Sequence, residues 1–122
     1  MQAEDKTIDK KEHGLREMQS SVDEWMSQWE AGYWPPLVNL ARLIEEVGEL
    51  SREINHHHGP KRKKASEQDR GKDAIGDELA DILFAVTAIA NSEGIDLQIA
   101  FDRMMDKVWK RDADRWERKQ PG

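Results

Sequence analysis

The stretch LADILFAVTAIA, residues 79–90, decides the fold class because its apolar character is almost unbroken. A helix that is apolar nearly all round is typical of a central, buried position rather than of a surface. We expect this helix to cover residues 73–92. Gly94 is a natural C-terminal stop for it, and Asp96 is a natural N-cap for a helix that follows.

Amphipathic patterns flank this helix on both sides. Apolar residues recur at steps of three and four, which predicts helices over about 15–30, 37–55 and 97–111. Pro35 and Pro36, in the segment AGYWPP, end the first of these helices and start the second. We find no alternating strand pattern and no internal repeat. The predicted class is therefore all-α, with four principal helices in a four-helix bundle-like fold.

Length and charge limit the classes of protein to which the chain can belong. Its 122 residues are enough for one domain, which we place at residues 15–119. We expect a flexible charged tail at 1–14 and a flexible basic loop at 56–72. A net charge of −6 argues against a nucleic-acid-binding face, and the absence of cysteine excludes disulfides and thiolate metal sites. With no signal-like start and no spanning apolar run, we expect a cytoplasmic protein without a membrane partner.

Two acidic motifs stand out. LIEEVGEL, residues 43–50, carries three glutamates on one side of the expected helix, and ELAD, residues 78–81, carries a Glu and an Asp at i,i+3 on the near-buried helix. The first motif alone is most simply a solvated surface, whereas burying the second pair costs several kcal/mol per ion (order of magnitude) unless a positive charge compensates. Together they favour a hard divalent ion, Mg²⁺ with Mn²⁺ as an alternative, held by oxygen ligands. The predicted ligands are Glu46, Glu49, Glu78 and Asp81.

The pattern EE-x-x-E followed by E-x-x-D resembles the signature of the MazG-like all-α nucleoside triphosphate pyrophosphohydrolases. The stretches ARLIEEVGELSREINH, DELADILFAVTAIANSEGID and DKVWKRDADRW are also similar, and with GYWPPL they look most like the YpjD-type branch. The resemblance implies Mg²⁺-dependent cleavage of a nucleotide between its α- and β-phosphates, in a homo-oligomer (dimer or tetramer) with sites near subunit contacts. It implies a catalytic set of five carboxylates, in which Glu45 binds a further metal or orients the attacking water. The five are Glu45, Glu46, Glu49, Glu78 and Asp81.

Candidate substrate-binding residues lie outside the acidic motifs. Lys107, Lys110 and Arg111 match a basic cluster of the family, although Lys110 serves equally well as a complement to the helix dipole. Tyr33 and Trp34 lie in a turn, where stacking on a nucleobase is plausible, whereas Trp25 and Trp29 are better explained by core or subunit packing. The run Lys61–Lys64 is either a lid over phosphates or simply part of a soluble loop, and the histidines at 56–58 are read as a solvated helix end.

The function predicted from these features is pyrophosphohydrolysis of (deoxy)nucleoside triphosphates, in the service of nucleotide-pool house-cleaning. Two alternatives stay open. One is a non-catalytic metal-binding helical oligomer that acts as a regulatory or interaction module. The other is a phosphoribosyl-ATP pyrophosphohydrolase. Base and sugar preference are not predicted.

Overall fold

The computed structural model describes residues 14–60 and 70–121, which form four helices and no strand. The helices are α1 (Leu15–Ser27), α2 (Pro36–His58), α3 (Lys72–Ser92) and α4 (Leu97–Arg111). The predicted all-α class with four principal helices is confirmed. Residues 1–13 and 61–69, which hold most of the predicted tail and of the predicted basic loop, lie outside the described residues.

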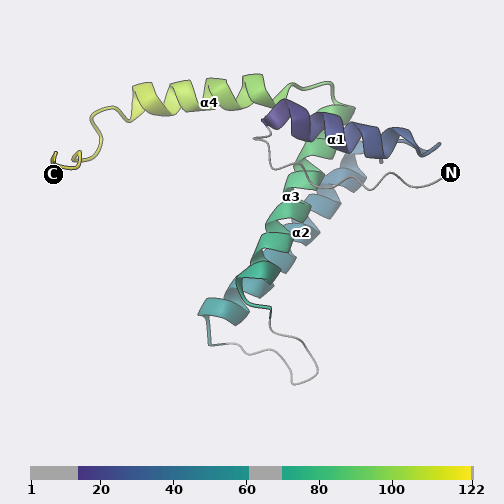
Figure 1. The fold of residues 1–122 in the computed structure, drawn as a ribbon, viewed down its shortest axis with the longest axis horizontal. Coiled ribbons are helices and arrows are strands. Elements are labelled where there is room, and N and C mark those ends of the chain that lie inside the picture. The colour runs from purple at the N-terminus through teal and green to yellow at the C-terminus, as the bar shows by residue number, and fades with distance from the viewer. Residues whose placement is uncertain (1–13, 61–69, 122) are drawn as a thin grey trace.

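The helices form an open arrangement (Figure 1). α2 and α3 lie antiparallel and side by side, and theirs is the most extensive helix–helix contact in the described chain. α1 crosses this pair at the end where α2 begins and α3 ends, and it contacts both α3 and α4. α4 then extends away as an arm instead of closing against α2 and α3. The bundle-like packing within one chain is thus limited to α1, α2 and α3.

The turn between α3 and α4 follows the sequence prediction closely. Gly94 has a φ of 67°, and the Ile95 N–H donates to the Ala90 carbonyl at 2.8 Å, which is the hydrogen bond of a Schellman C-cap. The Asp96 carboxylate accepts hydrogen bonds from the Gln98 and Ile99 N–H groups and so caps α4. Both predicted signals are confirmed.

The ends of the first two helices differ from the prediction. α1 ends at Ser27 rather than near residue 30, because a turn precedes Gly32, whose φ of 63° is not helical. α2 continues to His58 rather than to residue 55, so the three histidines form its last turn. His57 and His58 are exposed there, as a solvated helix end requires.

Alanine substitutions at Gly94, in a turn, and at Gly76, inside α3, should change the stability of the protein in opposite directions. Gly94→Ala should lower the free energy of unfolding by about 1–2 kcal/mol, because a Cβ disfavours the left-handed conformation at that position. Gly76→Ala, inside α3 with open space around the added Cβ, should instead raise it by about 0.5–1 kcal/mol. Urea denaturation of both variants measures the two effects, and equal effects would contradict this account of the turn.

The face of α2 that meets α3 is polar. Asn39 is only 4% exposed, and Arg42 and Glu46 are partly buried on the same side of the helix. The apolar stripe of α2 points outward instead, with Leu37 79% exposed and Ile44 63% exposed. α2 therefore turns Asn39, Arg42 and Glu46 inward and exposes most of its apolar stripe to solvent, which is the reverse of what an isolated soluble hairpin does.

The core is correspondingly small and lies along one side of α3. Ala85, Thr87, Ala88 and Ala90 are buried, whereas Leu79 and Leu83 are about half exposed. The prediction of a buried helix is confirmed for the side toward α1 and α2 and is wrong for the opposite side within one chain. No single helix among the described residues is long and apolar enough to cross a membrane, although α3 and α4 pass that test as a pair bent by 109°.

Candidate functional site

Three carboxylates converge where α2 and α3 face each other. Glu46 comes from α2, and Glu78 and Asp81, separated by three residues, come from one face of α3. Each offers an oxygen atom, and these atoms all lie within 4.8 Å of one another. Three oxygen donors at this spacing, from two packed helices, suit a hard divalent cation.

Glu78 is the member of this cluster whose surroundings disfavour a negative charge. Its Oε2 atom is inaccessible to solvent and has no hydrogen-bond partner among the described residues. Burial raises the pKa of Glu78 above the ordinary value of 4.5, and the negative charges of Asp81 and Glu46 raise this pKa further. A buried carboxylate oxygen without a donor costs free energy, and a bound cation would compensate it. The residues present therefore fit a divalent metal ion.

The raised pKa gives the metal-free protein a defined pH dependence. Between the ordinary carboxyl pKa and the raised pKa of Glu78, the folded state binds more protons than the unfolded state, so this group makes the free energy of unfolding fall as pH rises. Urea denaturation in chelator should show that loss in the wild type, relative to Glu78→Gln. Added Mg²⁺ should reverse it, because metal binding requires the ionised carboxylate. Parallel pH curves for wild type and Glu78→Gln would contradict the assignment.

The other two predicted catalytic glutamates lie outside the three-carboxylate cluster. Glu49 is exposed and outside the 4.8 Å group, but its charge contributes, as a smaller effect, to the raised pKa of Glu78. It follows Glu46 by three residues and so shares that side of α2. Glu45 is exposed and also outside the three-carboxylate group.

An aromatic pocket of about 290 Å³ is lined in part by Arg42, which lies four residues before Glu46 on α2. Trp34 and Phe84 form part of its wall, and the Arg42 guanidinium lies 5.0 Å from the Trp34 ring centroid and 5.5 Å from that of Phe84. Arg42 also approaches Glu46, with Nε 4.0 Å from Oε1, so one side chain joins the pocket to the acidic cluster. The remaining wall comes from Trp25, Met26, Trp29, Ala31, Gly32, Asn39, Ala85 and Ala88.

The aromatic residues divide between this pocket and the scaffold. Trp25 and Trp29 pack edge to face, with ring centroids 5.4 Å apart, yet both are about half exposed on the pocket wall rather than buried in a core. The Tyr33 hydroxyl donates to Asp23 at 2.8 Å and accepts from the Asn91 amide at 2.9 Å. Tyr33 thus ties the turn to α1 and α3 and does not line the pocket, whereas Trp34 does.

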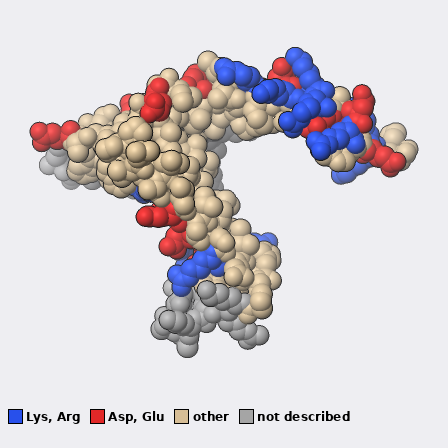
Figure 2. Space-filling model, turned by 180° about the vertical axis from the view of Figure 1, so that it is seen from behind, with Lys and Arg blue, Asp and Glu red and all other residues tan. Residues whose placement is uncertain are grey.

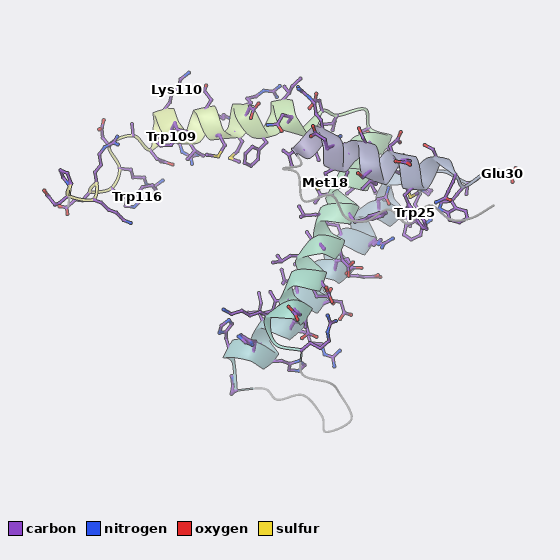
Figure 3. The ribbon with its side chains drawn as sticks, in the orientation of Figure 1. Met18, Trp25, Glu30, Trp109, Lys110 and Trp116 are labelled. Atoms are coloured by element: carbon purple, nitrogen blue, oxygen red, sulfur yellow. The ribbon has the colours of Figure 1, made fainter. Side chains whose placement is uncertain are left out.

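The predicted basic cluster lies far from the carboxylates of the same chain. Figure 2 shows acidic side chains on the α2–α3 pair and many of the basic side chains toward the far end of α4, where acidic side chains are interspersed with them. Lys110 and Trp109 lie on that distal part of the arm (Figure 3). Lys110 binds Asp106 at 2.9 Å and Arg111 binds Asp112 at 3.2 Å, while no pairing involves Lys107 within the described residues.

The family follows from the comparison with known proteins. A model of the MazG nucleotide pyrophosphohydrolase domain matches residues 35–116, which contain both acidic motifs and, from the pocket wall, Arg42 and Phe84. The chain belongs to the MazG family. YpjD of Bacillus subtilis (strain 168), a protein described as uncharacterized, is 45% identical over 108 residues, covering 88% of this chain and 95% of that one.

Solved structures of MazG proteins share the fold. The YpjD structure from Bacillus subtilis, described as a candidate pyrophosphatase, matches with a TM-score of 0.70 and 42% identity, covering 80% of this chain and 96% of that chain. A Bacillus-conserved MazG protein, described as a nucleotide pyrophosphohydrolase, matches with a TM-score of 0.68 and 38% identity, covering 80% and 90%. The predicted MazG-like fold and its likeness to YpjD are thereby confirmed.

Sequence reasoning did not find Arg42, Asn39 or Phe84. The Asn39 amide is buried and donates to the Trp34 carbonyl at 3.1 Å, which fixes the turn carrying the indole. Arg42 has a sequence signal, because it precedes Glu46 by four residues on the same side of α2. An arginine at that spacing reads as an ordinary surface ion pair unless the inward orientation of this face is known.

Proposed function

We propose that this MazG protein hydrolyses nucleoside triphosphates between the α- and β-phosphates, with Mg²⁺ held between α2 and α3. The observation that carries the proposal is the convergence of Glu46, Glu78 and Asp81, with the unpartnered Glu78 Oε2, beside an aromatic pocket. Bound Mg²⁺ would supply charge neutralisation for the phosphates and a lower pKa for a coordinated water. Mn²⁺ satisfies the same oxygen donors.

Each carboxylate has a role in this proposal. Glu46, Glu78 and Asp81 hold the ion, and Glu49 becomes the fourth ligand by a side-chain rotation from its exposed position. Glu45, which precedes Glu46 on α2, orients the attacking water or binds a further metal ion. The pocket takes the base, with Trp34 as the stacking surface, because every nucleobase has a face that an indole can cover. Tyr33 supports that surface through the turn rather than by touching the base.

A second copy of the chain completes this proposed site. Residues Lys107 and Arg111 share a face of α4, but the arm carries them away from the acidic cluster of their own chain. The outward apolar stripe of α2 and the exposed Phe101 and Trp109 of α4 also require a cover. A homo-oligomer that buries these faces brings the basic residues of one copy to the phosphates held by another. Lys110 then serves the same phosphates or the dipole of α4.

The test is turnover of a panel of dNTPs, NTPs and phosphoribosyl-ATP with Mg²⁺ or with chelator. We expect equal release of monophosphate and pyrophosphate from at least one nucleoside triphosphate, and none in chelator. Release of diphosphate and orthophosphate would overturn the reaction. Metal binding without any turnover would favour a regulatory module, and exclusive turnover of phosphoribosyl-ATP would assign the other substrate. House-cleaning in the cytoplasm predicts a preference for non-standard or surplus nucleotides.

A further inference from the structure

Arg42 is placed unlike any other cation of the described chain. It lies on the inward side of α2, four residues before Glu46, and its side chain is 34% exposed. It lines the aromatic pocket, where its guanidinium faces the rings of Trp34 and Phe84. Contacts with two rings restrict a planar guanidinium, so the orientation of its N–H groups is fixed in advance.

The hydrogen-bonding capacity of this guanidinium is unused among the described residues. Its approach to Glu46 is 4.0 Å from Nε to Oε1, well beyond the roughly 2.7–2.9 Å of a charge-assisted hydrogen bond. No hydrogen bond from Arg42 to another described residue is present. With its side chain 34% exposed, Arg42 loses part of its hydration, while its five N–H donors gain no close acceptor among the described residues. The side chain is therefore arranged to receive an anion.

The position of Arg42 identifies that anion. A nucleotide with its base in the pocket and its phosphates on the carboxylate-bound metal passes Arg42 between the two, and the first phosphate after the sugar is the α-phosphate. We propose that the Arg42 fork donates two hydrogen bonds to the non-bridging oxygens of the α-phosphate. This inference rests on the proposed function. It also explains why Arg42 pairs only weakly with Glu46. Because Glu46 binds the metal ion, Arg42 does not have to break a strong ion pair before it binds the phosphate.

The test compares product inhibition constants in the wild type, Arg42→Met and Arg42→Lys. Methionine fills the space between the two rings without a charge, and lysine keeps the charge without the fork. Arg42→Met should weaken inhibition by a purine and by a pyrimidine monophosphate by the same factor, about 10- to 100-fold, the range expected for lost hydrogen bonds to a charged group. Inhibition by pyrophosphate should stay within about twofold, because in this proposal pyrophosphate is held by the metal and by the basic residues of α4 rather than by Arg42. The inhibition constants of Arg42→Lys for the monophosphates should lie between those of the wild type and those of Arg42→Met.

The matched control is Arg16→Met, which removes an exposed arginine that pairs with Asp96 and is not among the residues that line the aromatic pocket. It should leave all inhibition constants unchanged. If Arg42→Met loses affinity for purine and pyrimidine monophosphates by different factors, Arg42 contacts the base. If it loses affinity for pyrophosphate by the same factor as for the monophosphates, Arg42 maintains the shape of the site. Either result overturns the α-phosphate contact while the proposed function stands. A wild type without turnover of any nucleotide overturns both.

Discussion

Glu78→Gln should reduce the rate of nucleotide hydrolysis about 1,000-fold, since losing several kcal/mol of metal-based transition-state stabilisation corresponds to about three powers of ten. The amide keeps the volume of the carboxyl group but not its charge, so the helices should pack as before. Because the Oε2 atom of Glu78 is buried, a water molecule can replace this oxygen as a metal ligand less easily than it can replace the other carboxylates. The measurement is kcat at saturating Mg²⁺, with far-ultraviolet circular dichroism as the check on folding.

Glu93→Gln is the matched control, because Glu93 caps the same helix at its far end and lies outside the carboxylate cluster. It should retain wild-type turnover. Asp81→Asn and Glu49→Gln should each lose activity to a similar degree as Glu78→Gln, the latter because Glu49 closes on the ion as the fourth ligand. Wild-type turnover in Glu78→Gln or Asp81→Asn would remove these residues from the metal site. Wild-type turnover in Glu49→Gln alone would remove only the fourth ligand.

The double variant Lys107→Ala/Arg111→Ala should lose about 100-fold or more in kcat/KM, since two charge-assisted contacts to the phosphates disappear. Mixing it with Glu78→Gln should restore about a quarter of wild-type activity after random exchange of equal amounts between dimers. Half of the dimers are then mixed, and each mixed dimer has one site with both defects and one intact site. Recovery follows only if the acidic and basic residues of a site come from different copies.

The control mixture is Glu78→Gln with Asp81→Asn. Both substitutions lie in the carboxylate cluster of one chain, so no mixed dimer regains an intact site and activity should stay at the level of the parents. No recovery in the first mixture, despite subunit exchange verified by mass spectrometry, would contradict the shared site. A monomeric mass for the wild type at micromolar concentration would contradict it as well.

Local sequence signals account for most of the helix boundaries. Pro35 and Pro36 act through their fixed φ, Gly94 through its access to the left-handed conformation, and Asp96 through its carboxylate, and none of these needs distant partners. The orientation of α2 has no such local cause. Hydrophobic periodicity identifies an apolar stripe but not the surface that covers it, and here the stripe faces away from α3.

The residues of the site also fall into two groups, those that local spacing predicts and those that depend on packing. Helical spacing places Glu78 and Asp81 on one face, and the structure brings them to Glu46 as the acidic motifs predict. The places of Glu49 and Tyr33 depend on side-chain rotation and on the fold of a turn, which spacing does not determine. Arg42 was not predicted as a residue of the site, because an arginine four residues before a glutamate is common on exposed helices. Only the packing of α2 against α3 distinguishes it from a surface ion pair.

The most direct measurement is anomalous diffraction from crystals of the protein with Mn²⁺ and a nucleotide whose α–β bridge is not hydrolysable. We expect an anomalous peak between α2 and α3, about 2 Å from oxygens of Glu46, Glu78 and Asp81, from an ion that is bound also to phosphate oxygens. A nucleotide bound with its metal ion elsewhere, and with these three carboxylates contacting only solvent, would contradict it.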